Sequence, residues 1–385
     1  MAEALPCVAQ QVGRYYLKES QNWIYHQVRA LSSVRSVFLA RERVPKASYP
    51  WNGVYTIEAL PLPVRLYQQA VAEVTGYLPL HRNACRREGV RLVHIHFGGR
   101  AVRGKALARV LGVPLVVSFY GRDMYYHPEG LEGLRRKYRR LFAEGTGFVA
   151  EGPAARDQLV RIGCPEEKVH IHRLGVDVRQ IPVIPREVSK HGPLRLLMAA
   201  RFTEKKGLPY GVEAFCRLAR EEPRLHLTIV GDAGDAKDGL RIRRRLLDLV
   251  ATSGVADRVR FTGLVSDTEL RILAREHHVF LHPSVHARDG DAEGGHPVVI
   301  TELAATGMPI IATRHCDIPE VVEDHHTGWL CEERDVDGLV AALREAVSHP
   351  DRLTAYGLNG RRLIEHKYDV RSTTLDAVYR EVLGQ

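Results

Sequence analysis

The sequence predicts an α/β protein made of two doubly wound domains in succession. Short β-branched segments alternate with amphipathic helical segments along most of the chain, as in a parallel sheet covered by helices on both faces. The alternation breaks once, in a polar segment with prolines at positions 182, 185 and 193, and then starts again. At 385 residues the chain is long enough for two such domains.

The first domain is expected over residues 1–180. Its helices are predicted at Ser20–Leu31, where Ser20 is a suitable N-cap, over most of Val64–Arg87, and at Ala101–Leu111. Its strands are predicted at Leu5–Val12, Val34–Ala40, Val54–Leu60, Leu92–Phe97, Pro114–Phe119, Phe148–Ala150 and Val169–Leu174.

A linker is expected at residues 181–193, and the second domain at 194–367. Residues 368–385 should form a C-terminal helix that packs back on the first domain. Helices of the second domain should begin near Leu208, Leu240, Ser266 and Pro297. Its strands are predicted at Leu194–Ala200, Leu225–Val230, Val259–Phe261, Val279–His282 and Pro309–Ala312. Ligands of such sheets bind beyond the carboxyl ends of the strands, so two domains facing each other would enclose a cleft.

Composition narrows the class of protein. The 45% hydrophobic and 26% charged residues are typical of a soluble globular protein, and neither a membrane-spanning run nor a signal peptide is evident, so a cytoplasmic location is expected. The six cysteines are scattered singly, without metal-type spacing. A net charge of +9 suits an anionic ligand or a membrane surface without requiring nucleic acid.

The segment His286–Pro309 is the strongest candidate for a binding site. It begins as a polar loop and continues, from Pro297, as an amphipathic run. Proline suits the first position of a helix, so the amides near Val298 and Val299 should point beyond the helix N-terminus. Those unpaired amides and the helix dipole favour a phosphate there. A capped surface helix with no ligand is the alternative.

Charged residues surround this predicted phosphate site. Glu293 should lie in the loop before the helix and Glu302 in its second turn, where carboxylates can bind hydroxyl groups. Arg201 and Lys206 follow the first strand of the domain and could neutralise a leaving diphosphate. Together these groups suit a nucleotide sugar. Solvated surface charges are the alternative interpretation of the two cations.

Six segments of the second half carry a resemblance to a known family. In order, they are RFTEKKGL, IVGDAG, VRFTGLVSDTEL, FLHPSV, EGGHPVVITELAATGMPIIAT and IPEVVEDHHTGWL. Their order and spacing resemble the retaining glycosyltransferases of family 4, and HIHFGG, SFYGRD and HRLGVD in the first half are similar to further family positions. The resemblance implies the GT-B architecture, in which two Rossmann-like domains face each other across a cleft.

The resemblance also implies roles for individual residues. Arg201 and Lys206 would hold the donor phosphates, Glu302 the ribose hydroxyls and Glu293 the donor sugar, with Arg201, Lys206 and Glu293 taking part in catalysis. No metal or other cofactor is expected, because the cations and the helix dipole offset the phosphate charge. The other implied substrate-binding residues are Gly231, Gly263, Gly294, Gly295, His296, Pro297, Val298 and Val299 in the second domain, and Tyr120, Gly121 and Asp123 in the first.

Two departures from the family pattern affect these assignments. Eight residues separate Glu293 from Glu302, one more than in the family, so Asp291 could take the place of Glu293. Tyr120 stands where many relatives have a histidine beside the reacting sugar. A tyrosine can donate a hydrogen bond but is a poor base at neutral pH.

Three other features have two interpretations each. Asp123 could bind a sugar hydroxyl or cap the next turn. His94 and His96 share one face of a strand and could bind a metal, although buried, hydrogen-bonded histidines are more common. The basic run Arg135–Arg140 lies on a predicted helix and could contact an anionic membrane at the inner face of the cell, or be an ordinary solvated face.

The sequence therefore predicts a retaining, metal-independent hexosyltransferase of polysaccharide biosynthesis. Its donor would be a UDP-, GDP- or similar nucleotide sugar. Its acceptor, bound by the first domain, would be a lipid-linked glycan or another glycoconjugate or natural-product precursor. The alternatives are a nucleotide-sugar epimerase or a phosphorylase on the same fold, and a protein that binds sugar nucleotides without catalysis.

Overall fold

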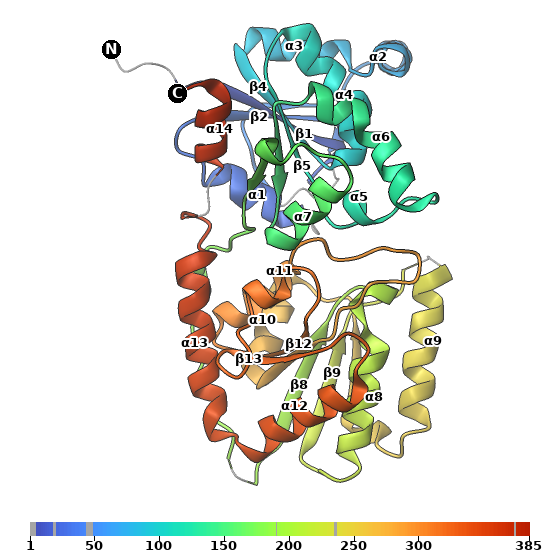
Figure 1. The fold of residues 1–385 in the computed structure, drawn as a ribbon, viewed down its shortest axis with the longest axis vertical. Coiled ribbons are helices and arrows are strands. Elements are labelled where there is room, and N and C mark those ends of the chain that lie inside the picture. The colour runs from blue at the N-terminus through green and yellow to red at the C-terminus, as the bar shows by residue number, and fades with distance from the viewer. Residues whose placement is uncertain (1–4, 18–20, 44–48, 190, 235–236, 373–374) are drawn as a thin grey trace. The chain divides into compact units, whose positions relative to one another are not determined.

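The computed structural model describes residues 5–17, 21–43, 49–189, 191–234, 237–372 and 375–385. The chain divides into two compact units, which are treated separately. The first unit comprises Met1–Gly175 with Val370–Gln385, and the second comprises Val176–Asp369. Each unit has one sheet flanked by helices (Figure 1), which confirms the predicted class of two doubly wound α/β domains.

The sheet of the first unit has the strand order β3-β2-β1-β4-β5-β6-β7, and all neighbouring strands are parallel. The strands β1 to β3 follow one another towards one edge of the sheet, and β4 to β7 follow one another towards the opposite edge. The direction in which strands are added therefore reverses between β1 and β4. The strands are β1 Cys7–Tyr16, β2 Arg35–Arg43, β3 Val54–Tyr55, β4 Val90–His96, β5 Leu115–Ser118, β6 Gly147–Ala150 and β7 Val169–Ile171.

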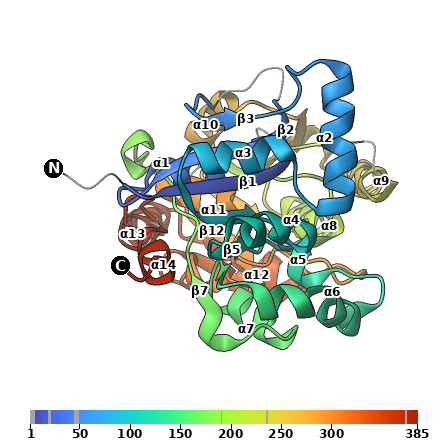
Figure 2. The ribbon, with the colours of Figure 1, turned by 90° about the horizontal axis from the view of Figure 1, so that it is seen from above.

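Alternating side chains of these strands contribute to separate apolar cores, two of which lie on opposite faces of the first sheet. One face packs against helices that follow the strands in sequence, such as α4 and α6, and the other packs against α14. Figures 1 and 2 show α14 and α6 on opposite sides of this sheet. The helices are α1 Asn22–Arg29, α2 Leu62–Thr75, α3 Pro79–Arg87, α4 Gly98–Leu111, α5 Arg122–Tyr125, α6 Gly130–Glu144, α7 Pro153–Arg161 and α14 Asp376–Leu383, with a 3₁₀ turn at η2 Glu166–Lys168.

Three predicted elements of the first unit differ from the structure or lie outside it. The segment Val64–Arg87 contains two helices, because Gly76 ends α2 with a φ of 85°. A side chain there would also meet the carbonyl of Arg103, 2.6 Å away. The strand β3 contains only two of the seven residues predicted at Val54–Leu60. The proposed N-cap Ser20 lies outside the described residues.

The sheet of the second unit has the order β10-β9-β8-β11-β12-β13. Its edge strand β13 was not predicted, because a four-residue strand in a polar region has no periodic signal. The strands are β8 Leu194–Ala199, β9 Leu225–Val230, β10 Val259–Gly263, β11 Val279–His282, β12 Ile310–Thr313 and β13 Gly328–Cys331. The helices are η3 Val178–Gln180, η4 Glu204–Lys206, α8 Leu208–Ala219, α9 Lys237–Ala251, η5 Ala256–Arg258, α10 Asp267–Glu276, α11 Val298–Ala305, η6 Ile318–Glu320, α12 Val336–Ser348 and α13 Asp351–Lys367.

The segment expected as a linker packs into the second unit, which begins at Val176. Arg186 is only 1% exposed. Its guanidinium donates to carbonyls at the C-terminal ends of α10 and α11, including those of His277 at 2.8 Å and Thr306 at 3.2 Å. A cation there satisfies the last, unpaired carbonyls of both helices, so the connector fixes one end of α11.

The chain returns to the first unit after Asp369. In α14 the carboxylate of Asp376 accepts hydrogen bonds from the amides of Ser32 at 3.1 Å and Ser33 at 2.9 Å. Leu375, Val378 and Tyr379 complete the apolar core on that face of the sheet. The last segment is therefore an integral part of the first unit.

Candidate donor site

A buried ion pair lies at the carboxyl ends of the strands in the second unit. Lys206, in the 3₁₀ turn after β8, has its Nζ 2.9 Å from Glu293 Oε1 and 2.9 Å from Oε2. Ser284, just after β11, donates to Glu293 Oε1 at 2.9 Å. The two charged side chains are 14% and 6% exposed. The structure thus brings together two of the three predicted catalytic residues.

Burial and charge oppose each other at this pair. Burial would raise the pKa of the Glu293 carboxyl, but the nearby Lys206 and Lys205 ammonium groups hold that pKa well below its usual range. Burial lowers the pKa of Lys206, while Glu293 opposes that shift. His282 Nε2 lies 4.0 Å from Glu293, and burial lowers the pKa of this histidine to about 3. The pair is therefore ionised, with a neutral histidine beside it.

Asp291, the alternative to Glu293, lies in a different position. Its carboxylate is 3.3 Å from Lys205 Nζ, which also donates to the carbonyl of Ala292 at 2.9 Å. Each carboxylate thus has its own lysine. The carboxylate beside Lys206 is that of Glu293 and not that of Asp291, although the loop has one more residue than the family pattern.

Arg201 is exposed at the end of β8. Its positive charge contributes to lowering the pKa of Lys206, which places the two cations in one electrostatic environment. Within the described part of the chain, the side chain of Arg201 forms no hydrogen bond or ion pair. Its guanidinium is therefore available to an anionic ligand, whereas the Lys206 ammonium is shared with Glu293.

The helix α11 begins one residue later than predicted. Pro297, expected at the first helical position, occupies the N-cap with extended backbone (ψ 126°), and Val298 is the first helical residue. The first amides of a helix have no partner within it, so those of Val298 and Val299 remain the predicted anion donors. Glu302 is half-buried in the second turn, as expected.

The predicted glycines have different backbone roles. Gly231 adopts a φ of 129°, and a Cβ there would lie 1.9 Å from the Ala200 carbonyl oxygen, so close packing alone requires glycine. Gly263 adopts a φ of 73° and faces open space. Gly294 has a φ of 89° in the loop before α11. That loop continues through Gly295 and His296, which are both buried.

Sequence reasoning missed a polar network that supports this loop. The amide of Glu293 donates to His315 Nε2 at 3.2 Å, and His315 Nδ1 donates to Glu333 at 2.7 Å. The same carboxylate accepts from the backbone amide of His286 at 2.8 Å and from its ring at 2.7 Å. His315 and Glu333 are the second residues after β12 and β13. Their positions at strand ends were the one available signal.

His286, His315 and Cys316 have ligand-type atoms within 4.8 Å of one another. A metal at this position would need a ring nitrogen of His315. Both of those nitrogens already serve the network, one bonded to Glu333 and the other to the Glu293 amide. The cluster therefore fits a structural role in holding the loop.

The predicted residues on the acceptor side all lie in the first unit. Both oxygens of Asp123 accept amides at the start of α4, from Gly98 at 2.9 Å and Gly99 at 3.3 Å. Asp123 thus stabilises the N-terminus of α4 and not the next turn. Tyr120 and Gly121 are buried in the loop after β5. His94 and His96 are fully buried and hydrogen-bonded on both ring nitrogens, as expected for structural histidines.

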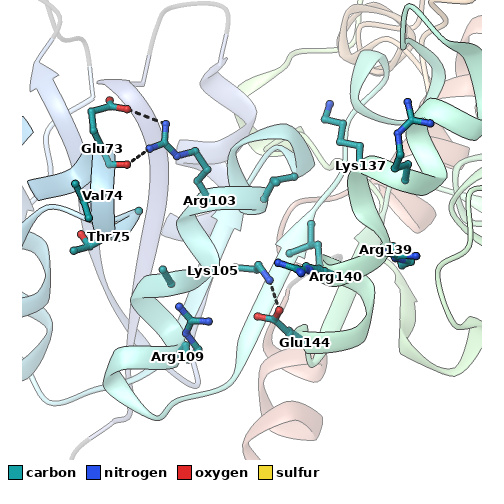
Figure 3. Close-up of a pocket in the computed structure, with 15 residues that line it drawn as sticks. Glu73, Val74, Thr75, Arg103, Lys105, Arg109, Lys137, Arg139, Arg140 and Glu144 are labelled. Carbon is teal, nitrogen blue, oxygen red and sulfur yellow. Dashed lines mark hydrogen bonds and ion pairs between the residues drawn. The ribbon is translucent and has the colours of Figure 1, made fainter. Parts of the chain in front are cut away.

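A cationic pocket of about 410 Å³ lies elsewhere in the first unit, between α4 and α6 (Figure 3). Arg103 pairs with Glu73, and Lys105 pairs with Glu144. In the described ranges, Arg109, Lys137, Arg139 and Arg140 form no ion pair with a carboxylate. Arg135 does not line this pocket. The cations that do are Arg103, Lys105, Arg109, Arg136, Lys137, Arg139 and Arg140.

Lys206→Met would leave the buried Glu293 carboxylate without its counter-ion. We expect the free energy of unfolding to fall by roughly 3–5 kcal/mol in urea titrations. Lys206→Met/Glu293→Gln should regain most of that loss, and Arg201→Ala, at an exposed position, should stay within about 0.5 kcal/mol of the wild type. A Lys206→Met protein as stable as the wild type would contradict the buried pair.

Two family models match the chain. The model of "Glycosyltransferase Family 4" matches residues 21–180, and that of "Glycosyl transferases group 1" matches residues 182–363. An amylovoran biosynthesis glycosyltransferase, AmsK of Erwinia amylovora, is 33% identical over 253 residues, 66% of this chain and 60% of that protein. The putative colanic acid biosynthesis glycosyltransferase WcaL of Escherichia coli is 32% identical over 279 residues, 71% of this chain and 66% of that protein.

Solved structures share the fold over nearly the full length of the chain. Anabaena Alr3699/HepE in complex with UDP and glucose has a TM-score of 0.74 at 16% identity and covers 98% of this chain and 99% of its own. A sucrose-phosphate synthase from Thermosynechococcus elongatus has a TM-score of 0.72 at 17% identity, with the same coverage. These similarities confirm the expected GT-B fold class.

The chain spans 60 to 66% of the length of the two curated relatives described above. The first family model ends at residue 180 and the second begins at residue 182. This junction lies close to the boundary between the two units, at Gly175–Val176. The segments that carried the resemblance lie within the matched residues. This chain therefore belongs to the group 1, family 4 glycosyltransferases.

Proposed function

We propose that this chain is a retaining, metal-independent glycosyltransferase that moves a hexose from a nucleoside diphosphate to a glycan acceptor. The observation that carries the proposal is the buried Lys206–Glu293 pair at the strand ends of the second unit. It places a fixed cation and a fixed carboxylate side by side. Those are the groups that a departing diphosphate and a sugar hydroxyl require.

The chemistry assigns one task to each group. As the bond between sugar and diphosphate breaks, negative charge grows on the phosphate, and Arg201, Lys206 and the first amides of α11 are placed to stabilise it. A diphosphate beside Lys206 would share that ammonium with Glu293, whose carboxylate could then accept a hydrogen bond from the sugar. The acceptor would attack on the face of the leaving group, with a phosphate oxygen taking its proton.

The relatives support the choice of substrates. Solved structures of the same fold contain UDP or UDP-glucose, so a nucleotide sugar is proposed as the donor here. The relatives named for amylovoran and colanic acid biosynthesis favour an acceptor on the route to an extracellular polysaccharide, such as a lipid-linked glycan.

An anionic membrane surface is proposed as a further contact of the first unit. No helix in the described residues is long and apolar enough to cross a membrane. The pocket between α4 and α6 gathers seven cations against two carboxylates. Each exposed cation near an anionic bilayer contributes about 1 kcal/mol of attraction, and such a contact would bring the enzyme to a lipid-linked acceptor.

Transfer should be measured with a panel of UDP- and GDP-sugars and acceptor extracts, in the presence of excess chelator. We expect the wild type to turn over under these conditions. Arg201→Ala should lower kcat/KM by roughly 30- to 1000-fold, the equivalent of about 2–4 kcal/mol of lost stabilisation. Arg244→Ala, an exposed arginine on α9, is the control. Normal rates in Arg201→Ala would remove this residue from the site, and nucleotide binding without turnover would favour the non-catalytic alternative.

Substitutions of the two glutamates should have different effects on nucleotide binding and on sugar transfer. Glu302→Gln should weaken binding of the bare nucleoside diphosphate by roughly 10- to 150-fold in calorimetry, because a ribose hydroxyl loses a charged acceptor. Glu293→Gln should leave that affinity within about threefold and depress transfer, because its partner is the sugar. Asp291→Asn, which disturbs the neighbouring Lys205–Asp291 pair, is the matched control. A fully active Glu293→Gln beside an inactive Asp291→Asn would reverse this assignment.

Membrane contact should depend on the unpaired cations of the pocket. Arg109→Gln/Lys137→Gln/Arg140→Gln should lower binding to phosphatidylglycerol vesicles more than tenfold in flotation assays, and phosphatidylcholine vesicles should not bind. Arg243→Gln/Arg244→Gln/Arg245→Gln on α9 removes the same charge from the second unit and should retain binding. Equal losses in both variants would show that net charge, and not the pocket, is responsible.

A further inference from the structure

A second pocket of the first unit, about 270 Å³ in volume, is lined by four arginines and is called the arginine pocket here. The guanidinium groups come from three elements: the second half of β1, the second half of β2 and the first turns of α4. Among the described residues that line the pocket, none carries a carboxylate. The four arginines are Arg14, Arg41, Arg100 and Arg103.

The pairing of the strands explains why a pocket can form at this position. β1 stays paired with β2 as far as Tyr16, whereas its pairing with β4 ends at Gln11. The direction in which strands are added reverses between β1 and β4, and open α/β sheets bind ligands beyond the carboxyl ends of the strands at such a point. The arginine pocket therefore lies where this type of sheet receives a ligand.

The guanidinium groups of the pocket outnumber the carboxylates that pair with them. Arg14 lies 3.2 Å from Glu42. Arg41 and Arg103 share Glu73, at 3.9 Å and 3.0 Å. Four cations against two carboxylates leave an excess of two positive charges. A phosphate monoester carries about two negative charges at neutral pH, so this excess suits a phosphate or diphosphate better than a single carboxylate.

Arg100 is held in place without a carboxylate. Across the residues that the structure describes, its exposed side chain forms no hydrogen bond or ion pair. Its guanidinium carbon lies 4.7 Å from the centre of the Phe97 ring, a cation–π contact. The guanidinium also lies against Gly13, where a Cβ would be 2.2 Å from Nη1. Asp123 accepts hydrogen bonds from amides of α4 instead. The planar fork of Arg100 can therefore bind two oxygens of an anion.

One buried polar atom of the pocket has no partner. The side-chain oxygen Oε1 of Gln11 is buried and, in the described part of the structure, forms no hydrogen bond. Gly104 on α4 leaves room for this amide, because a Cβ there would lie 3.2 Å from Gln11 Nε2. A buried amide that is left unsatisfied costs free energy. A ligand could satisfy it, since the amide can turn its oxygen to a hydroxyl or its nitrogen to a phosphate oxygen.

We propose that the arginine pocket binds the phosphate or diphosphate group of the acceptor. The proposal rests on the proposed function, in which the first unit binds the acceptor. The volume of the pocket lies just below the range of pockets that hold a whole drug-sized ligand, so the pocket takes the charged group and leaves most of the acceptor outside. A lipid-linked glycan and a soluble sugar phosphate both carry such a group.

The neighbourhood of the pocket favours the lipid-linked source. Gly76 and Arg103 line both the arginine pocket and the pocket between α4 and α6, and Figure 3 shows Arg103 beside Glu73 at the edge of the latter. The two pockets are therefore neighbours. A lipid whose phosphate occupies the arginine pocket would keep its chain close to the cations that are proposed to contact the membrane.

Calorimetry with geranyl diphosphate tests the pocket without any activity. Arg201→Ala serves as the parent protein, so that the candidate donor site contributes less to the binding of a diphosphate. Arg41→Gln/Arg100→Gln in this parent should weaken binding by roughly tenfold or more, because hydrogen bonds between charged groups are lost. Arg86→Gln/Arg91→Gln is the matched control. It removes the same charge from exposed positions of the first unit outside the pocket and should keep the affinity within about twofold.

Two other probes identify the source of the phosphate. Tighter binding of geranyl diphosphate than of inorganic pyrophosphate would support a lipid-linked acceptor. Equal binding of both, with the same dependence on Arg41 and Arg100, would support a pocket for the phosphates alone, as a soluble sugar phosphate requires. The proposal would be overturned by glucuronate that binds as tightly as either diphosphate, by diphosphates that do not bind, or by equal losses in the two double variants.

Transfer assays test the assignment to the acceptor. Arg41→Gln/Arg100→Gln should raise the KM for the acceptor extract by roughly tenfold or more and leave the KM for the nucleotide sugar within about twofold, because only acceptor binding is removed. An unchanged KM for the acceptor, or an equal rise of both KM values, would contradict the assignment. If the wild type transfers no sugar from any donor, the proposed function fails, while calorimetry still decides whether the pocket binds phosphate.

Discussion

The second unit is arranged around the need to keep Lys206 and Glu293 together away from water. Two buried charges stabilise a protein only when geometry and hydrogen bonds compensate for their lost hydration. Parallel strands meet this need because their carboxyl ends lie at one edge. The turn after β8 supplies the lysine, and Ser284, two residues after β11, supplies a hydroxyl. His315 and Glu333, in the segments after β12 and β13, hold the backbone of the glutamate.

Elements with a periodic signal and polar residues next to strand ends were predictable from sequence. Most strands, the helix after Pro297, and the grouping of Lys206 with Glu293 followed from pattern and resemblance. The His315–Glu333–His286 network did not, because its contacts join polar loop residues 18 and 47 positions apart. Such contacts follow from the folded sheet order and leave no periodicity in the sequence.

The same limit applies to His94 and His96. Their alternation on a strand predicted a shared face, and their type predicted buried hydrogen bonds, but the partner Tyr379 lies 285 residues further along the chain from His94. The departure at Tyr120 acquires a physical explanation only in the folded unit. The Tyr120 hydroxyl is hydrogen-bonded to His96 Nδ1 at 2.9 Å, and His96 Nε2 to Gln10 Oε1 at 3.1 Å, so a tyrosine there helps to satisfy a buried histidine among apolar strands.

The chain passes between the two units twice, at Gly175–Val176 and at Asp369–Val370. This path determines where chimaeras between relatives can be joined. A second unit transplanted with a junction at the prolines near residue 193 would leave behind Arg186, which binds the ends of α10 and α11. A C-terminal segment transplanted with it would separate Tyr379 from its partners on β1 and β4. An exchange of the second unit between relatives therefore needs Val176–Asp369 as one block, with both ends of the chain retained from the parent that supplies the first sheet.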